Sequence, residues 1–401
     1  MNDPIAERAL AAGRKAFGDD WAPRRIASAP GRIELLGNHL DYNGGPVLCA
    51  AIDRRLVVLQ GDGDADGSDV AVAAADAPEA GVGRFEAEAL RNWRNPEHPP
   101  DTFAYVRGLV AGAAERPGLS LRRPSTLAIA GDVPLGFGLS SSAALCVGLA
   151  LALVEPRPAD PDLVLLAQEA EHRAGTPCGT MDQSASVAGG VIRYDGATLA
   201  VERLSPDLGD LVFVVADSGV ERSLGTSSYP ARVEESRAAL AHANRVLGTN
   251  LPHLAALSPD QLATLSAGPG ALPSPLLERA RHVVGETVRV ADGLDALCAG
   301  DWPTFGRLMT ESGRSSATDY AISHPRVEEL VAEILAVGGV LGARMMGGGE
   351  GGAVLALVPR SRVPGLELVL NAGYFRRYEM DERPGLVHPC SFAQGASVRP
   401  V

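Results

Sequence analysis

Lysine is almost absent from this sequence. Lys15 is the only lysine among the 401 residues, and it lies in a helical pattern near the start of the chain. No GxxxxGKS or GxxxxGKT motif is present, and no lysine is placed to pair with nucleotide phosphates as in P-loop proteins or protein kinases. The sequence therefore excludes both of those nucleotide-binding classes.

Cysteine is also sparse, and the number of cysteines is odd. The five residues are far apart and form no CxxC pair: Cys49, Cys146, Cys178, Cys298 and Cys390. This spacing argues against a disulfide framework and against a cysteine-ligated zinc site. We expect reduced thiols.

Positive charge and long apolar runs are scarce as well. The formal net charge is −13, so the chain has no basic footprint and nucleic acid is not an expected partner. The first 21 residues, MNDPIAERALAAGRKAFGDDW, contain no uninterrupted apolar segment, and no later run is long enough to span a membrane. We expect a soluble cytoplasmic protein that is a monomer or a weak homo-oligomer.

Apolar residues make up 46% of the chain, which is enough for a large core and two domains. Strand-like and helical patterns alternate irregularly, which favours an α+β class over a doubly wound parallel sheet. The Ala-, Asp- and Gly-rich residues 61–81 are expected to form a loop. A boundary near residues 205–210 divides the chain into two predicted domains, 1–207 and 208–401. The strand-like runs are residues 54–59, 126–131, 189–194 and 211–219, and the helical patterns are 140–154, 162–175, 231–248 and 325–338.

The segment GNHLDYNGG, residues 37–45, places polar side chains between glycines and lies between two stretches typical of buried strands. Glycine permits positive φ or a close backbone approach, and the polar residues offer both donors and acceptors. This combination suits a polyol ligand. A turn whose polar residues bond only to its own backbone has the same composition, so the segment alone does not separate the two interpretations.

A second segment, GDVPLGFGLSSSAAL, leads Gly136 and Gly138 into a helix that begins with Ser140, Ser141 and Ser142. The start of a helix has unpaired N–H groups and partial positive charge, so it can bind phosphate without a lysine. A serine hydroxyl there can also reach a magnesium ion. An ordinary serine-capped helix accounts for one serine but poorly for the whole segment.

Two more segments carry candidate chemistry. Asp182 follows a glycine turn in GTPCGTMDQ, and Glu171 lies on the helical pattern before it. One carboxylate could accept or orient the proton of a sugar hydroxyl and the other could hold magnesium, although either residue alone is more typical of a solvated face or a helix cap. The glycine-rich segment GARMMGGGEGGAVL, residues 342–355, can close over a ligand or form a tight hairpin.

Taken together and in this order, these segments resemble the motifs of the galactokinase branch of the GHMP small-molecule kinases. The resemblance runs from about Ser28 to Val358. The matching segments are GRIELLGNHLDYNGG (the N-terminal signature), VPLGFGLSSSAAL (the ATP-phosphate motif), GTPCGTMDQ (the catalytic segment) and GARMMGGGEGGAVL (the third motif), with further similarity in FAYVRGLV (103–110) and SSYPARVEE (227–235).

The resemblance implies an ATP-dependent sugar 1-kinase that uses Mg²⁺. It also implies an N-terminal ribosomal-S5-like domain, a C-terminal ferredoxin-like domain and an active site in the cleft. Asp182 is implied as the catalytic carboxylate beside the anomeric hydroxyl, with Arg32 stabilising it and the transferring phosphoryl group. The implied sugar contacts are Asn38, His39, Asp41, Gly179 and Tyr229. The implied ATP contacts are Gly136, Gly138, Leu139, Ser140, Ser141, Ser142 and Ala143, and the implied magnesium ligands are Ser142 and Glu171.

Several features depart from the family pattern. Asn38 stands where galactokinases usually carry a glutamate at the O6 end of the sugar, so we expect weaker discrimination at that end. Cys146 replaces a common glutamate, Glu350 replaces an aromatic residue, and the spacing from Glu171 to Asp182 is one residue shorter than usual.

Because of Asn38, the sugar stays open between galactose and a related uronic acid, pentose or N-acetylhexosamine. A sugar- and ATP-binding regulator without turnover is the alternative from another class, and the intact GLSSSAA segment and Asp182 argue against it. A mevalonate- or homoserine-type kinase is disfavoured by HLDYN and GTMDQ.

Overall fold

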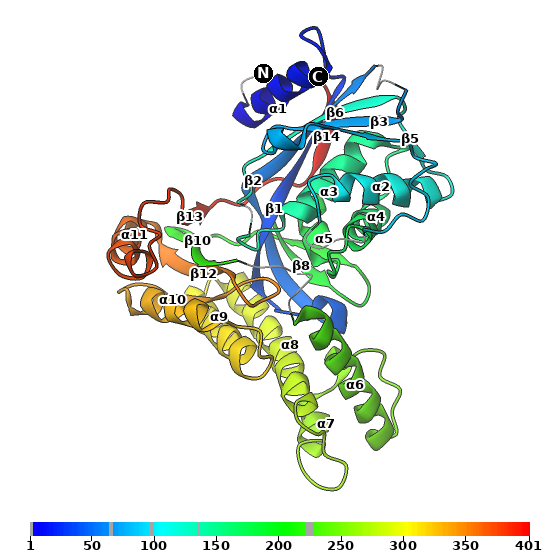
Figure 1. Ribbon diagram of the computed structural model, residues 1–401. Coiled ribbons are helices and arrows are strands. Elements are labelled where there is room, and N and C mark those ends of the chain that lie inside the picture. Colours follow the sequence, from blue (N-terminus) through cyan, green and yellow to red (C-terminus); the bar gives the residue numbers. More distant parts are fainter. Residues whose placement is uncertain (1–2, 64–66, 96–99, 135, 222–227) are drawn as a thin grey trace.

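The structure is a computed structural model that describes residues 3–63, 67–95, 100–134, 136–221 and 228–401 (Figure 1). Within these residues, eight strands form one sheet in which β14-β1-β2-β6-β3-β4 are neighbours, while β8 pairs with β2 and β9 pairs with β8. The strands are β1 (Arg25–Leu36), β2 (Pro46–Asp62), β3 (Val70–Ala74), β4 (Val82–Phe85), β6 (Ser125–Gly131), β8 (Val191–Asp195), β9 (Val201–Leu204) and β14 (Ser397–Pro400).

Alternating apolar residues of this sheet bury both of its faces. Successive side chains of a strand point to opposite faces. Val57 and Leu59 therefore pack with α1 (Pro4–Phe17), whereas Val58 between them belongs to the cluster on the other face. Four helices cover that second face (Figure 1): α2 (Ala104–Glu115), α3 (Ser141–Leu153), α4 (Asp160–Arg173) and α5 (Met181–Ala188).

The long strand β2 joins two parts of the sheet. Its second half pairs with β6 and its first half pairs with β8, while β1 pairs along nearly all of it. The turn between β1 and β2 is the segment GNHLDYNGG, with a short 3₁₀ helix at Asp41–Asn43. The sheet therefore holds this turn at one end of its two longest strands.

The expectation of a loop over residues 61–81 is wrong at residues 61–62, which end β2, and at residues 70–74. Val70–Ala74 forms β3, which pairs in parallel with β6, and its two valines are buried. Repeated alanine and aspartate around this short run obscured the alternation that marks a strand. A separate two-stranded ribbon is formed by β5 (Ser120–Leu121) and β7 (Val154–Glu155).

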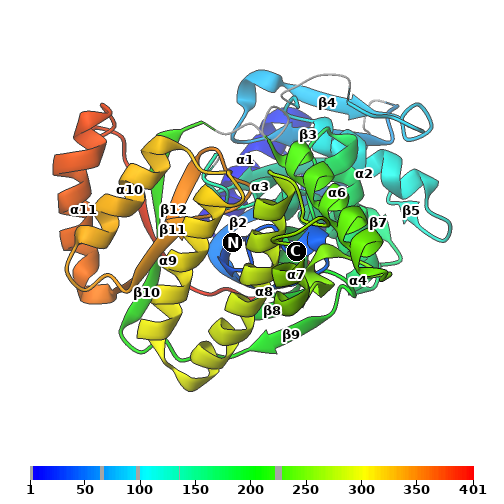
Figure 2. The ribbon, with the colours of Figure 1, turned by 90° about the horizontal axis from the view of Figure 1, so that it is seen from below.

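A second, antiparallel sheet follows in the order β11-β12-β10-β13. Helices α9 and α10 contact β11, and α8 runs beside α9 (Figure 2). The strands are β10 (Leu211–Val220), β11 (Gly342–Met345), β12 (Gly352–Pro359) and β13 (Val387–Cys390); the helices are α6 (Tyr229–Leu247), α7 (Pro259–Thr264), α8 (Leu276–Ala299), α9 (Trp302–Thr318), α10 (Pro325–Ala336) and α11 (Val363–Leu370).

The two sheets share one apolar core. A single buried cluster contains Ile33 and Leu48 of the first sheet, Val214 of the second and Phe305 of α9. The chain passes from β9 to β10 across residues 205–210, yet β14 returns to pair with β1. The division into 1–207 and 208–401 stays a prediction, and the α+β class is observed.

All five cysteines are free, as expected. No helix in the described ranges combines the length and the apolar character needed to cross a bilayer.

Candidate active site

A cavity of about 260 Å³ lies where β1, the start of α3, the segment between α4 and α5, and the β11–β12 turn meet. All the residues expected in the site line it except Asn38 and Ala143. Ala143 lies in the first turn of α3 with its methyl group buried, and its expected contact with ATP stays a prediction. The expected residues that do line it are Arg32, His39, Asp41, Gly136, Gly138, Leu139, Ser140, Ser141, Ser142, Glu171, Gly179, Asp182 and Tyr229.

Arg32 and Asp182 form the central ion pair of the cavity. Arg32 comes from β1 and Asp182 from the first turn of α5. Nε and one terminal nitrogen of Arg32 donate to Asp182 Oδ1 at 2.7 and 2.5 Å, and its other terminal nitrogen donates to the Gly138 carbonyl at 2.5 Å. Burial opposes the charge of Arg32, but the carboxylate of Asp182, and then that of Glu34, outweighs it and raises the pKa of Arg32. Asp182 is thus held beside a fixed cation.

The chain enters α3 through a series of left-handed residues. Gly136, Gly138 and Ser140 have φ values of 83°, 72° and 60°, a region that glycine adopts without steric cost. Ser140 directly precedes the helix, and its hydroxyl donates to Asp182 Oδ2 at 2.5 Å. The hydroxyl of Ser140 therefore orients the carboxylate, while Ser141 and Ser142 of the first turn line the cavity.

Ser142 and Glu171 lie together on the α3 and α4 side. Ser142 Oγ donates to Glu171 Oε1 at 2.7 Å, and the amide of Gln183 donates to Glu171 Oε2. Burial raises the pKa of Glu171 to about 7, and the negative charge of Asp182 adds to the rise. The shorter spacing in the sequence thus still brings Glu171 and Asp182 to one cavity.

This pair of oxygen ligands fits a magnesium ion that takes its other ligands from phosphates and water. Within the described ranges, no cluster of three or more His, Cys, Asp or Glu side chains could hold a metal by itself.

Asp41 and Gly179 meet at another part of the cavity wall. A Cβ atom at position 179 would lie 1.6 Å from Asp41 Oδ2, so only glycine leaves room for this carboxylate. Burial raises the pKa of Asp41 to about 7, and the charge of Asp182 adds to the effect. The ring of His39 packs beside that of Tyr229, with centroids 5.4 Å apart, and His39 Nδ1 is 2.8 Å from the hydroxyl of Tyr42.

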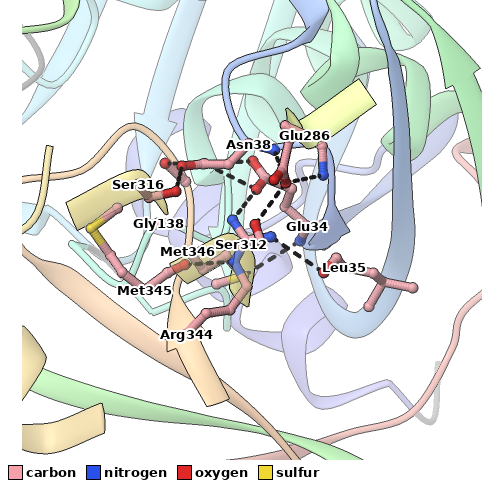
Figure 3. Close-up of polar contacts among 12 residues, drawn as sticks. Glu34, Leu35, Asn38, Gly138, Glu286, Ser312, Ser316, Arg344, Met345 and Met346 are labelled. Carbon is pink, nitrogen blue, oxygen red and sulfur yellow. Dashed lines mark hydrogen bonds and ion pairs between the residues drawn. The ribbon is translucent and has the colours of Figure 1, made fainter. Parts of the chain in front are cut away.

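Asn38 lies behind the cavity wall and is fully buried. Its Nδ2 donates to Glu34 Oε1 at 3.0 Å and to the Gly347 carbonyl at 2.9 Å, and its Oδ1 accepts from Ser316 Oγ at 2.9 Å (Figure 3). This placement corrects the expectation that Asn38 contacts the substrate directly, because both polar groups of its amide are already bonded within the protein.

The carboxylate that does line the cavity here is Glu34, which the sequence analysis did not single out. Glu34 follows Arg32 by two residues on β1, so strand alternation places both side chains on one side. The signal was present in the sequence as a charged residue inside the apolar run IELL. Its side chain was overlooked because the neighbouring turn carried the recognisable motif.

The other two departures from the family pattern lie away from the cavity. Cys146 is fully buried among apolar residues of the first sheet's core. Glu350 lies in the β11–β12 turn with φ 62°, and its Oε2 accepts from the Ser228 N–H at 3.0 Å, just before α6 begins. Neither residue is part of the cavity wall.

Comparison with known proteins agrees with this geometry. Residues 14–61 match the galactokinase galactose-binding signature, residues 104–190 the GHMP kinase N-terminal domain and residues 294–374 the GHMP kinase C-terminal domain. The chain is 36% identical to the galactokinase of Homo sapiens over 376 residues, covering 91% of this chain and 92% of the human protein. It is 38% identical to the galactokinase of Roseiflexus sp. (strain RS-1) over 387 residues, covering 93% and 92%.

Solved structures show the same fold. The crystal structure of Lactococcus lactis galactokinase complexed with galactose matches with a TM-score of 0.87 and 26% identity, covering 98% of this chain and 99% of that one. The mevalonate kinase of Methanococcus jannaschii matches with a TM-score of 0.64 and 15% identity, covering 92% and 99%, which shows a shared fold alone.

The fold and the site together define a GHMP kinase, an ATP-using enzyme with an α+β two-domain fold. Within that family the chain belongs to the galactokinases, as the signature at residues 14–61 and the full-length relatives show. The family expected from the motifs is therefore confirmed.

Proposed function

We propose that this chain catalyses transfer of the γ-phosphoryl group of ATP to the anomeric hydroxyl of galactose. The observation that carries the proposal is the Arg32–Asp182 pair. It lies between a turn suited to a polyol and a helix start suited to phosphates, so one ion pair can meet both reacting groups. The galactokinase signature over residues 14–61 supports galactose as the sugar.

The ATP phosphates are assigned to the start of α3. Its first-turn N–H groups and partial positive charge attract an anion, and the glycines before it allow a close approach. This arrangement neutralises phosphate charge in a chain whose single lysine lies elsewhere. The residues assigned to the phosphates are Gly136, Gly138, Leu139, Ser141 and Ser142, with Ala143 contributing only backbone.

Ser142 and Glu171 are the proposed protein ligands of Mg²⁺. When bound there, the ion would neutralise phosphate charge that develops during transfer. The carboxylate of Glu171 must be ionised to serve as a ligand. The hydrogen bond from Gln183 holds its other oxygen in place.

The sugar is assigned to the side of the cavity that Asp41, His39, Tyr229 and Gly179 line. A carboxylate and an imidazole can bond to ring hydroxyls. An aromatic ring can pack on the apolar face of a pyranose.

We assign to Asp182 one of two roles: it accepts the proton of the anomeric hydroxyl, or it orients that hydroxyl by a hydrogen bond. Ser140 and Arg32 fix its two oxygens, so the carboxylate is positioned before the substrate binds. Phosphoryl transfer depends mainly on in-line positioning and charge neutralisation. Arg32 then remains beside the reacting oxygens as charge moves onto them.

A panel of sugars tests the proposed function. ADP release would be measured with galactose, galacturonate, arabinose and N-acetylgalactosamine, and ³¹P–¹H NMR would locate the phosphate in the product. We expect galactose 1-phosphate as the main product. Phosphate on O6 would overturn the assigned geometry, and absence of ADP release with every sugar would favour a binding protein without turnover.

Replacing Asp182 by Asn tests the role of its charge. The variant keeps the shape of the side chain but loses the proton acceptor, so we expect kcat to fall by roughly two to four decades while ATP affinity changes little. Steady-state kinetics and nucleotide titration would measure both quantities. Near-normal turnover would remove Asp182 from the reaction centre.

The location and assembly of the chain remain predictions. We expect a cytoplasmic enzyme that is a monomer or a weak homo-oligomer. Light scattering at several protein concentrations would measure its molar mass.

A further inference from the structure

Glu34 is a buried carboxylate at the cavity wall that the proposed chemistry does not use. Only 2% of its surface is exposed. Its Oε1 accepts hydrogen bonds from Arg344 at 2.5 Å and from Asn38 Nδ2 at 3.0 Å. Its Oε2 makes a longer contact, 3.3 Å from the same Nδ2. A carboxylate accepts about four hydrogen bonds, so Oε2 keeps capacity for a donor inside the cavity.

Arg344 fixes Glu34 from the second sheet. It is fully buried on β11 and also donates to the carbonyls of Leu35 and Met345, at 3.3 and 3.0 Å (Figure 3). Its guanidinium therefore cannot turn toward the cavity without leaving carbonyls unpaired. The ion pair joins β1 directly to β11.

Asn38 fixes Glu34 from the turn. Its Nδ2 lies between two acceptors, the Glu34 carboxylate and the Gly347 carbonyl, so the amide has one favourable orientation. The backbone N–H groups of Gly37 and Asn38 donate to Glu286 Oε1 at 2.9 and 3.1 Å, and Ser312 donates to the same oxygen at 2.6 Å. A glutamate at position 38 would instead bring a second carboxylate against Glu34.

We propose that Glu34 is a specificity-determining residue whose Oε2 accepts a hydrogen bond from one non-anomeric hydroxyl of the sugar. Asn38 and Arg344 are positioning residues that hold this carboxylate. The inference rests on the proposed sugar-kinase function and deepens it: the substrate must carry a neutral donor at that position, and a sugar with a carboxylate there is repelled. Asn38 alone led us to expect weak discrimination between sugars at the O6 end. In this proposal Glu34 discriminates between sugars instead.

A glutamine at position 34 tests the acceptor role. Arg344 and Asn38 are both donors, so the glutamine carbonyl would turn toward them and its NH₂ toward the cavity. The variant thus presents a donor where the wild type presents an acceptor. The measurement is kcat/KM for galactose and its 2-, 3-, 4- and 6-deoxy derivatives, on wild type and Glu34→Gln.

In wild type we expect one deoxy sugar to lose roughly 10- to 200-fold in kcat/KM, the scale of one hydrogen bond to a charged group. In Glu34→Gln, kcat/KM for galactose should fall by a similar factor. The difference in kcat/KM between galactose and that one deoxy sugar should nearly vanish. The other deoxy sugars should keep their wild-type ratios to galactose.

Two further variants keep the result interpretable. Glu34→Gln with Arg344→Met removes both buried charges, and it replaces the single variant if an unpaired Arg344 prevents folding. Glu235→Gln removes the carboxylate that pairs with buried Arg279 outside the cavity wall, and it should leave the wild-type pattern intact.

An unchanged deoxy-sugar pattern in both Glu34 variants, with wild type active on galactose, overturns this inference alone. Absence of wild-type activity on every sugar counts against the proposed function instead.

Discussion

At the scale of single residues, Gly179 and Asp41 depend on each other. The Asp41 carboxylate occupies the space that any side chain at position 179 would need. The sequence showed both residues inside motifs. It could not show that they touch, because 138 positions (179 − 41) separate them along the chain. Their contact depends on how the β1–β2 turn meets the segment before α5.

We expect Gly179→Ala to lower kcat/KM for the sugar by about 100-fold, the scale of an ångström-sized displacement in a site. The added methyl group forces Asp41 away from its place, whereas ATP affinity should hold because the start of α3 is untouched. Gly338→Ala is the control, since a Cβ there meets no atom within 4 Å. Equal sugar kinetics in both variants would contradict the assigned role of Asp41.

Glu171 leads to a prediction about pH. Its pKa, raised to about 7 by burial and then by Asp182, leaves it largely protonated below pH 7, while magnesium needs the ionised form. Binding of Mg²⁺ and ATP should therefore weaken about 5- to 10-fold from pH 8 to pH 6 and release close to one proton at the acid end.

Calorimetry in buffers of different ionisation enthalpy would count the proton. The same measurement on Glu171→Gln is the control. ATP and Asp41 titrate in the same pH range in wild type and in this variant, so only the difference between the two proteins reports on Glu171. The raised pKa also means that the stabilisation from a protonated Glu171 is present at acid pH and is lost as pH rises through about 7. A pH dependence shared by both proteins would assign the titration to another group.

The neighbouring pair Glu34 and Asn38 shows where sequence reasoning stopped. Motif comparison drew attention to Asn38, the residue that departs from the family. Burial and bonding to Gly347, Ser316 and Glu34 are tertiary facts that no local pattern contains. Strand alternation from Arg32 could have identified Glu34, because it needs only the period of two residues.

At the scale of elements, most helices and strands lie where periodicity placed them. Residues 211–219 became β10 and residues 325–338 contain α10, since long periodic apolar patterns determine these elements strongly. The start of α3 was anticipated from its glycines and serines. The left-handed backbone of Ser140 was not, because a serine in the sequence gives no sign of a positive φ.

Helices α2 and α4 cross closely at a glycine. A Cβ at position 108 would lie 2.3 Å from the Ala170 carbonyl, whereas a Cβ at position 112 would make ordinary contact with Leu166. We expect Gly108→Ala to lower the free energy of unfolding by about 1 to 3 kcal/mol through overpacking. Gly112→Ala should be neutral or stabilise by up to about 1 kcal/mol, because alanine favours a helix.

Urea unfolding would measure the two variants side by side. Loss of stability of the same size in both would show that the glycines serve helix flexibility rather than close packing. Gly108 packs against Ala170 of α4, and the next residue of that helix is Glu171, which lines the cavity. Gly108→Ala is therefore expected to weaken Mg²⁺ and ATP binding as well.

At the scale of the whole molecule, one core supports both halves of the site. The cavity takes Arg32 from the first sheet and Gly347 from the turn between β11 and β12 of the second. Composition alone predicted two domains and a large core. It could not predict that the last strand returns to the first sheet, because Ser397–Pro400 has no distinctive apolar alternation.

Strand β14 covers the edge of β1 by antiparallel pairing from Arg25 to Ser28. Deleting residues 397–401 should lower the melting temperature by several degrees, on the scale of about 2 to 4 °C for each kcal/mol lost. It would also expose a strand edge that favours association. Activity at 25 °C should persist, since Arg32 lies beyond the paired stretch.

Differential scanning fluorimetry and light scattering would follow the deletion, with removal of Val401 alone as the control. Loss of activity without loss of thermal stability would instead connect the C-terminal strand to the cavity.

The single lysine has a practical consequence for attaching the enzyme to a surface. Lys15 is exposed on α1, on the face of the first sheet opposite α3, whose first turn lines the cavity. Amine-reactive coupling can use no other side chain in this sequence. The terminal α-amine has a lower pKa than a lysine and reacts first, so it has to be blocked beforehand. A sensor chip or bead would then hold the molecules by this one helix, on the face of the first sheet away from the start of α3.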